Sequence, residues 1–399
     1  MKPLIDRLHE KFSASEICNP DVIPDVHEWD RFLNNLPKAK DCIDSSFNKY
    51  LCRMKYFPWY KKLIANIFGV CVLPVEIFFL FKSNKAIEKI PNKRTAVLEK
   101  SRDVPDYKDI FPTELYDKYN VTVAENFNKK FGILCREARK LLLKCIKRHP
   151  FHFFYIYFIY MELAAHSHFL LTYNPEAVIV YVNERNVAGS VITELYEGNG
   201  RKFISFMHGE YLMQLVQGFM AFSQYYIWDK LYIDMFKRLK CDIGEYIVYT
   251  PGKLERKWDI ETSDPPFYCT YYLSGQSKES ILRLGSILEG LEAQGKRCKV
   301  RLHPRTLQNV KEELKAFKNL TIEDPIHLSL KESLETTQYV VGLNTTVLSE
   351  AYIEGKQIVI DDVSDPKRFK DAEERGSAAF SKEHLLLSEL LDPVLITYI

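Results

Sequence analysis

The fold of this chain can be predicted outward from residues 299–305, which read Lys-Val-Arg-Leu-His-Pro-Arg. Val300 and Leu302 alternate with charged residues, and alternation with a period of two is typical of a β-strand. Pro304 has no backbone N–H to donate to a strand ladder, so the strand is predicted to end at His303. In an open α/β sheet, ligands bind at the carboxyl ends of the strands. We therefore expect a ligand near His303.

The chemistry of this strand end suits a phosphate group. Arg301 and Arg305 lie on either side of His303 in the sequence. Arginine offers a rigid fork of donors to phosphate oxygens, and histidine can hold or release a proton near neutral pH. A solvated strand end without a ligand is the alternative, and these residues alone do not decide between the two.

Composition limits the classes of protein that fit. The 399 residues are enough for two domains, and a net charge of +2 argues against a general nucleic-acid binder. The 9 cysteines are scattered without a Cys-x-x-Cys pair, which indicates reduced thiols and a cytoplasmic setting. The first residues, Met-Lys-Pro-Leu-Ile-Asp, lack the apolar region of a signal peptide.

Residues 63–81 are the most apolar stretch of the sequence, and lysines stand on both sides of it. Its length approaches the roughly 20 residues that span a bilayer, but Glu76 interrupts it, and a charge in mid-membrane is costly. Burial as a helix or strand of the first domain is our first choice. Peripheral contact with the inner face of the cell membrane comes second, and a true span comes last.

The N-terminal half is predicted to end in an α/β series. Residues 82–120 read as a loop-rich connection, and two helices follow over 122–148 and 151–171. Strands and helices then alternate, which implies parallel strands with right-handed crossovers. The strands are predicted over 177–182, 202–207, 225–228 and 243–249, and the helices over 187–196 and 229–239.

A second α/β series follows a linker over residues 251–266, which is rich in proline and charge. Its strands are predicted over 267–273, 298–302, 320–322, 339–341 and 357–360, and its helices over 278–294, 310–317, 329–336, 347–354 and 382–391. We therefore predict a first domain over 1–255 and a second, ligand-binding domain over 256–385. The tail, 386–399, is expected to pack back on the first domain.

Three loops of the second domain each follow a strand, namely 274–277, 303–305 and 342–346. Gly342 lets the backbone approach a ligand, and Thr345 and Thr346 can cap the following helix. The amides and dipole of a helix N-terminus favour an anion. Glu350, one turn further along, could accept a hydrogen bond from a ribose hydroxyl or could simply be a surface carboxylate.

Two segments carry a resemblance to a known family. Residues 203–209 (Phe-Ile-Ser-Phe-Met-His-Gly), preceded by 175–182, resemble the N-terminal half of bacterial surface-polysaccharide glycosyltransferases of GT-B architecture. Residues 302–305 (Leu-His-Pro-Arg), followed by 341–351, resemble their C-terminal half. The pattern is most similar to the sialyltransferases and polysialyltransferases that use CMP-sugars.

The resemblance implies an α/β protein with two Rossmann-like domains facing a cleft. It further implies transfer of a sugar, sialic acid first, from a CMP-sugar to a capsule or lipooligosaccharide acceptor, with His303, Thr345 and Thr346 on the donor phosphate. No Asp-x-Asp metal clamp occurs in the chain, so we expect neither a metal nor another cofactor. The full set of predicted donor-binding residues is Gly275, Gln276, Arg301, Pro304, Arg305, Glu323, Asp324, Asn344, Thr345, Thr346 and Glu350.

The transfer also needs a base for the acceptor hydroxyl. The candidates lie at predicted strand ends of the first domain: Glu184, His208 and Glu210. Glu184 is preferred because it follows the strand that reads as most buried, although it could instead be a surface carboxylate paired with Arg185. His208 could alternatively bind the acceptor or the donor phosphates.

Other functions fit the same architecture. A capsule-type transferase could use a UDP-sugar, CMP-Kdo or CDP-glycerol. A nucleotide-sugar epimerase would need no separate acceptor, and a non-catalytic assembly subunit would not need to bind a nucleotide.

Overall fold

The computed structural model describes residues 25–81, 96–99, 110, 111, 115, 121–124, 132–173, 177–180, 184–255, 258, 260, 264–303 and 320–391. Its described residues form two compact units. The first runs from His27 to Lys253, and the second contains the chain from Leu254 onward together with the short segment Gly209–Leu212. The observed boundary, after Lys253, lies close to the predicted boundary, after residue 255. Both units are α/β, as the sequence predicts.

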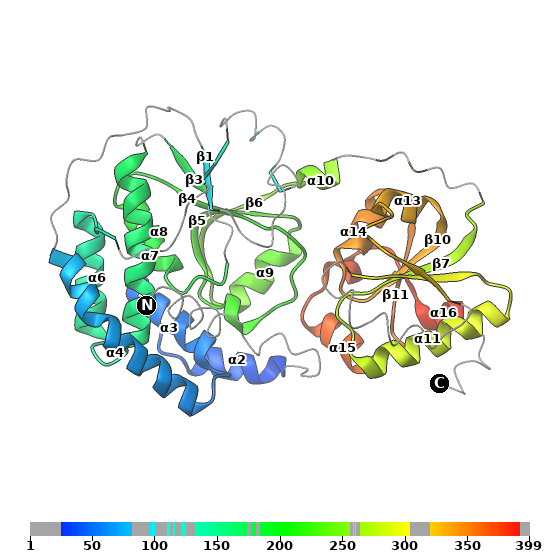
Figure 1. The fold of residues 1–399 in the computed structure, drawn as a ribbon, viewed down its shortest axis with the longest axis horizontal. Coiled ribbons are helices and arrows are strands. Elements are labelled where there is room, and N and C mark those ends of the chain that lie inside the picture. The colour runs from blue at the N-terminus through cyan, green and yellow to red at the C-terminus, as the bar shows by residue number, and fades with distance from the viewer. Residues whose placement is uncertain are drawn as a thin grey trace. The chain divides into compact units, whose positions relative to one another are not determined.

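The first unit is built on a parallel sheet of six strands (Figure 1). In spatial order these are β2 (Thr122–Ala124), β1 (Ala96–Glu99), β3 (Val178–Val180), β4 (Phe203–Phe206), β5 (Ala221–Ile227) and β6 (Asp242–Val248). The parallel pairing of β3 to β6 agrees with the prediction.

Two strands contradict the sequence interpretation. β1 lies inside the stretch predicted as a loop-rich connection, and β2 occupies the start of a predicted helix that begins only at α6 (Arg136–Arg148). These strands have four and three residues. Segments that short show no measurable period. They form strands because β1 pairs with β3 and β2 pairs with β1.

Helix α7 (Phe153–Thr172) is a long helix of the first unit. It is apolar on all sides because it is buried almost throughout its length. Its His166 is fully buried and lies 3.0 Å from the Tyr196 hydroxyl on α8 (Gly189–Glu197). The unit also contains α2 (Val26–Asn35), α3 (Cys42–Met54), α4 (Trp59–Phe81) and α9 (Leu231–Arg238), and α10 (Gly252–Glu255) spans its boundary with the second unit.

Helix α4 (Trp59–Phe81) corrects the prediction that residues 63–81 are buried. Among the described residues it is the one helix long and apolar enough to cross a membrane. Only 28% of its most apolar 18-residue segment is buried. A narrow stripe, which includes Gly69 and Glu76, is covered where α4 packs along α7. Hydropathy measures only how apolar a segment is, so it cannot tell a core helix from one whose apolar side is left exposed.

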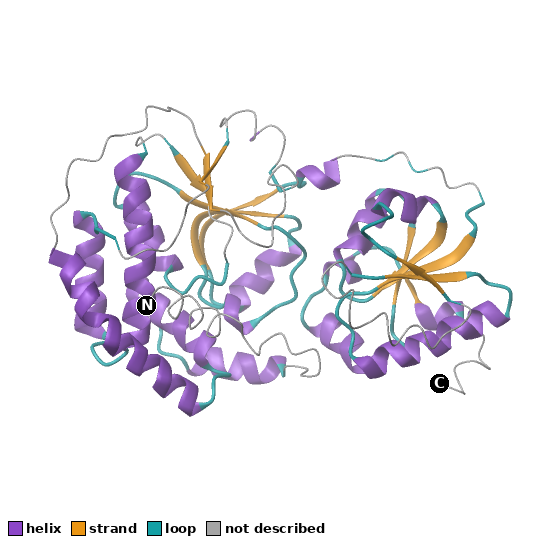
Figure 2. Ribbon diagram, in the orientation of Figure 1, coloured by secondary structure: helices purple, strands orange, loops and turns teal. Residues whose placement is uncertain are grey.

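The second unit also contains a six-stranded parallel sheet, with helices on both faces (Figure 2). Its strands in spatial order are β12 (Leu385–Leu386), β11 (Gln357–Ile360), β10 (Thr337–Gly342), β7 (Phe267–Tyr272), β8 (Cys298–Arg301) and β9 (Thr321–Glu323). The chain moves outward in one direction from β7 to β9 and in the other from β10 to β12. This is the doubly wound order, with its switch point between β7 and β10.

The helices of the second unit are α11 (Lys278–Ala293), α13 (Leu330–Glu335), α14 (Thr346–Ile353), α15 (Pro366–Glu374) and α16 (Leu387–Leu390). Helix α15 was not predicted, because its sequence is mostly charged. In the tail, a short strand and α16 replace the helix predicted over 382–391. Leu387 and Leu390 lie in the core of the second unit, so the described part of the tail packs there. The helix predicted over 310–317 lies outside the described residues.

Glu76 generates a prediction about stability. It is 3% exposed, and burial raises the pKa of its carboxyl to about 8. Between the unfolded pKa, about 4.3, and 8, the folded protein holds a proton that the unfolded chain has released. The free energy of unfolding should therefore fall as the pH rises through this window. In Glu76→Gln this dependence should be lost, and the variant should be more stable than the parent protein at pH 8.

Urea denaturation at several pH values across the window checks this prediction. Glu197→Gln, at an exposed position of α8, is the matched control and should keep the pH dependence of the parent protein. An unchanged pH dependence in Glu76→Gln would contradict the assignment.

Candidate functional site

Three strands of the second sheet end at the same level. Across the sheet, Arg301 of β8 pairs with Tyr272 of β7, and Tyr272 pairs with Gly342 of β10. The loops that follow therefore leave the sheet side by side, with His303 two residues beyond the end of β8. The strand end predicted at His303 lies at residue 301, and His303 is half-buried. Pro304 and Arg305 lie outside the described residues.

The loops on the two sides of the switch point are tied together. The Ser274 hydroxyl, after β7, donates to the Leu343 carbonyl, after β10. The Ser274 amide donates to Gln276 Oε1 at 2.7 Å, and Arg368 of α15 donates to the Gly275 carbonyl at 2.9 Å. Gly275 has a φ of +84°, which a glycine adopts without strain. Predicted residues Gly275 and Gln276 thus help to shape the switch point.

Two helices start at this switch point. Ser277 caps α11, its hydroxyl accepting from the Ser280 amide at 3.1 Å. Thr345 caps α14, its hydroxyl accepting from the Val347 amide at 3.4 Å. Asn344 takes the left-handed conformation that starts this turn, with φ of +54°. The positive ends of two helix dipoles therefore lie beside the ends of β7 and β10, where they favour an anion.

Gly342 allows the close approach at the end of β10. A Cβ atom at this position would lie 2.9 Å from Thr345 Cγ2 and 3.4 Å from the Tyr272 carbonyl oxygen. A larger residue would therefore push the α14 cap away from the sheet. Thr346, the first residue of α14, is half-buried.

Beneath the loops lies a buried hydrogen-bonded pair. The Tyr271 hydroxyl donates to Asp361 Oδ2 at 2.7 Å, and burial raises the pKa of Tyr271 well above its usual value. The Ser364 hydroxyl donates to the same carboxylate. Gln276 Nε2 lies 3.3 Å from the Tyr271 oxygen, so this pair supports the loop after β7 from below.

The structure gives two predicted donor-binding residues a different environment. Glu323 pairs with Arg301 and, at 2.6 Å, with Lys299 Nζ, and all three side chains are nearly inaccessible. Arg301 also donates to the Leu328 carbonyl at 2.8 Å. These contacts fasten the turn after β9 to β8, which is a structural role. Asp324 takes part in that turn by accepting from the Ile326 amide at 2.9 Å.

Two predicted carboxylates lie on or beside α14. Glu350 is half-buried on that helix. Glu210, predicted at a strand end of the first domain, belongs to the segment that packs with the second unit, where its carboxylate accepts a hydrogen bond from the Ser349 hydroxyl.

In the first unit, Glu184 and His208 come together at the carboxyl edge of the sheet. Glu184 follows β3 and His208 follows β4, and Glu184 Oε1 lies 3.5 Å from His208 Nδ1. The Tyr225 hydroxyl of β5 lies 3.3 Å from the same oxygen. Glu184 is 5% exposed, whereas the side chain of His208 is 23% exposed. The carboxylate is therefore the inner member of the pair and the imidazole the outer one.

The loop that carries Glu184 is held from two sides. Asn186 Nδ2 donates to Glu162 of α7 at 3.1 Å, and Asn186 Oδ1 accepts from the Ala188 amide at 2.9 Å. Arg185 donates to Gln214 Oε1 at 3.1 Å. The alternative prediction, that Glu184 is a surface carboxylate paired with Arg185, is therefore wrong.

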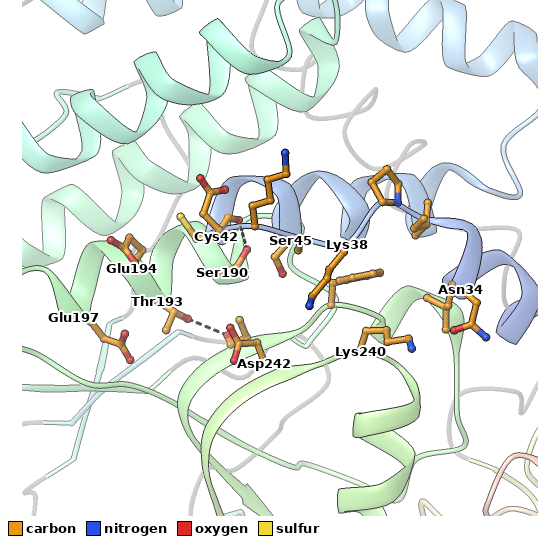
Figure 3. Close-up of a pocket in the computed structure, with 18 residues that line it drawn as sticks. Asn34, Lys38, Cys42, Ser45, Ser190, Thr193, Glu194, Glu197, Lys240 and Asp242 are labelled. Carbon is orange, nitrogen blue, oxygen red and sulfur yellow. Dashed lines mark hydrogen bonds between the residues drawn. The ribbon is translucent and has the colours of Figure 1, made fainter.

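A separate pocket of about 600 Å³ opens in the first unit at the opposite edge of the sheet (Figure 3). Its wall includes Ala221 and Asp242, the first residues of β5 and β6. Lys38, Lys240 and Glu197 also line it, so its charge is mixed. The pocket lies at the amino ends of the strands and is distinct from the Glu184–His208 pair.

Sequence reasoning missed two members of these sites, Tyr225 and Arg368. The sequence pattern indicates for Tyr225 only the start of a strand, and Arg368 lies in α15, a helix that the pattern does not predict. No group of three or more His, Cys, Asp or Glu side chains in the described part of the chain is arranged to hold a metal ion.

No protein-family model matches this sequence, and no curated protein matches it either. Among solved structures, the chain is similar to UDP-GlcNAc 2-epimerase from Methanocaldococcus jannaschii, at 13% identity and a TM-score of 0.39, over 78% of this chain and 91% of that chain. It is similar to a glycosyltransferase from Rickettsia africae ESF-5 at 15% identity and a TM-score of 0.37, over 68% and 80%. It is also similar to the wall teichoic acid polymerase TagF, at 10% identity and a TM-score of 0.37, over 78% of this chain and 80% of that chain. Similarity at this level identifies neither a family nor an activity for this chain.

Proposed function

We propose that this protein is a glycosyltransferase that takes a sugar from a nucleotide-sugar, with CMP-sialic acid as the favoured donor, and transfers it to a surface glycan. The observation that carries the proposal is the level ending of β8, β7 and β10 at the switch point of the second sheet. This alignment gathers His303 and the starts of α11 and α14 at the edge where doubly wound sheets bind nucleotides. The preference for CMP comes from the His-Pro and Thr-Thr resemblance.

The donor side of the reaction is assigned to the second unit. As the bond between the sugar carbon and the phosphate oxygen breaks, negative charge grows on the departing nucleotide. His303 would donate a proton or a hydrogen bond to that phosphate, and the amides at the start of α14 would hold it. Stabilisation of this kind is stronger in the transition state than in the ground state, which is the condition for raising turnover.

The acceptor side is assigned to the first unit. An acceptor hydroxyl must lose its proton as its oxygen bonds to the sugar carbon. His208, the more exposed member of the pair, would take that proton on Nε2. Glu184 would accept a hydrogen bond from the Nδ1–H of His208 and so fix the tautomer of the imidazole. Glu184 is then a positioning residue, a change from the sequence-based preference for it as the base.

The donor assignment predicts which nucleotide stabilises the protein. CMP should raise the thermal unfolding temperature more than UMP, UDP, CDP or GMP. At a concentration of about 100 times its dissociation constant, a ligand adds about 2.7 kcal/mol to the free energy of unfolding. Thr345→Val combined with Thr346→Val should reduce the CMP shift, because it removes the cap of α14.

The comparison is made by thermal denaturation with each nucleotide in turn. Thr193→Val, on α8 of the first unit, is the matched control and should keep the CMP shift. A larger shift with UDP or CDP would favour a UDP-sugar or CDP-glycerol transferase, and turnover of the nucleotide-sugar without an acceptor would indicate an epimerase. If no nucleotide shifts the transition, the proposed function is wrong.

His303→Ala should lower the rate of transfer by about a hundred- to a thousandfold. This is the usual cost of removing one hydrogen-bond donor that stabilises a developing negative charge. The variant should stay folded, since His303 is half-buried at a strand end. EDTA should leave the rate of the parent enzyme nearly unchanged. Steady-state kinetics with CMP-sialic acid measure both effects. A folded His303→Ala variant with full activity, or an enzyme that EDTA inactivates, would refute this role.

The pair in the first unit predicts a distinctive kinetic pattern. His208→Ala should lose about a hundred- to ten-thousandfold in kcat, the usual contribution of a general base, and added imidazole should restore part of it. Glu184→Gln should lower kcat with the KM for the donor nearly unchanged, and Glu184→Asp should restore part of the activity. Arg185→Ala, in the same loop, is the control and should stay close to the parent enzyme. If Glu184→Gln is inactive while His208→Ala is not, Glu184 itself is the base.

A further inference from the structure

Helix α4 leaves an apolar face without cover in the described structure. Residues at helical spacing along this face are largely exposed, with Trp59 at 74%, Phe78 at 62% and Phe81 at 76%. Leu63, Ile67 and Val70 are about half exposed on the same helix. An exposed apolar patch of this kind marks an interaction site, whereas single exposed apolar residues do not.

The basic residues of α4 lie at one end of the helix. Glu76 is its one acidic residue, and it is buried on the side that faces α7. Lys61 and Lys62 lie in the first turn, next to Trp59 and Tyr60. Aromatic rings combined with lysines are the side chains that anchor a helix at the boundary between headgroups and acyl chains.

The opposite side of α4 is fitted closely to α7. A Cβ atom at Gly69 would lie 2.5 Å from the backbone carbon of Phe153, so only glycine allows this approach. Asn66 Oδ1 accepts from the Phe154 amide, the two atoms being 3.3 Å apart, and so satisfies a donor at the start of α7. A helix that crossed the bilayer would have to leave these contacts and expose buried Glu76.

We propose that α4 is a membrane-docking surface that lies in the plane of the interface of a bilayer containing anionic lipids, with its exposed face in the lipid and its other face on α7. At 1.5 Å per residue its 23 residues extend over roughly 34 Å along the surface. A helix in the interface usually has a polar face of its own, and here the protein body occupies that side. The lysines favour an anionic lipid surface over a second copy of this chain, because the α4 of a second copy offers no exposed carboxylate to pair with them.

Vesicle flotation of the full chain tests the proposal without depending on the proposed enzymatic function. The protein should float with phosphatidylcholine vesicles that contain phosphatidylglycerol, and less with phosphatidylcholine alone. The triple variant Leu63→Ser, Ile67→Ser, Phe78→Ser should bind vesicles about a thousandfold more weakly, because burial of each of the three side chains contributes about tenfold or more.

A matched triple variant removes equally exposed apolar side chains elsewhere: Leu143→Ser, Leu282→Ser and Ile326→Ser should bind like the parent protein. Lys61→Gln with Lys62→Gln should weaken binding to the anionic vesicles by on the order of tenfold and leave binding to phosphatidylcholine unchanged. This variant keeps the apolar face intact, so it tests the proposal even if the serine variant fails to fold.

Carbonate extraction should release the bound protein, and retention would show a span instead. Absence of vesicle binding, or equal loss in the matched triple variant, would overturn the proposal. A dimer in solution that the Leu63, Ile67 and Phe78 substitutions dissociate, in a protein that does not bind vesicles, would assign the face to a second copy.

Discussion

The parallel pairing of β7 with β8 on one side and β10 on the other is the constraint on which the second unit depends. Because Arg301, Tyr272 and Gly342 lie in one row, the loops beyond them start from the same level of the sheet. A slip of one residue in either pairing would turn every side chain of the slipped strand to the other face. The Ser274–Leu343 hydrogen bond and the buried Tyr271–Asp361 pair can form only in the observed register.

Buried polar groups in both units hold loops in place. In the second unit, Lys299 and Arg301 share the carboxylate of Glu323, which holds the turn after β9 against β8. In the first, Asn186 is bonded to Glu162 of α7 and so holds the loop that carries Glu184. Desolvated charges are costly unless they are paired. These partnerships therefore favour one arrangement of each loop over others with the same apolar core.

The apolar helix α4 illustrates the limit of a hydropathy argument. Helices α4 and α7 are both long and predominantly apolar, yet α7 is buried almost throughout its length and α4 only along a stripe. What distinguishes them is the set of neighbours that the fold places around each helix. Gly69 permits the close approach to α7 on one side, and no described element covers the other side to the same degree.

The sequence by itself determined the α/β class, the two-unit division and the strands from β3 to β11, because apolar runs, their period and the Pro and Gly breaks are local properties. It also placed His303, Glu184 and His208 at strand ends. Only the tertiary structure decided that β1 and β2 are strands, that Arg301 faces Glu323, and that Glu184 meets His208 and Tyr225. Those outcomes depend on sheet order and on partners far apart in the chain, and a local pattern carries no information about either.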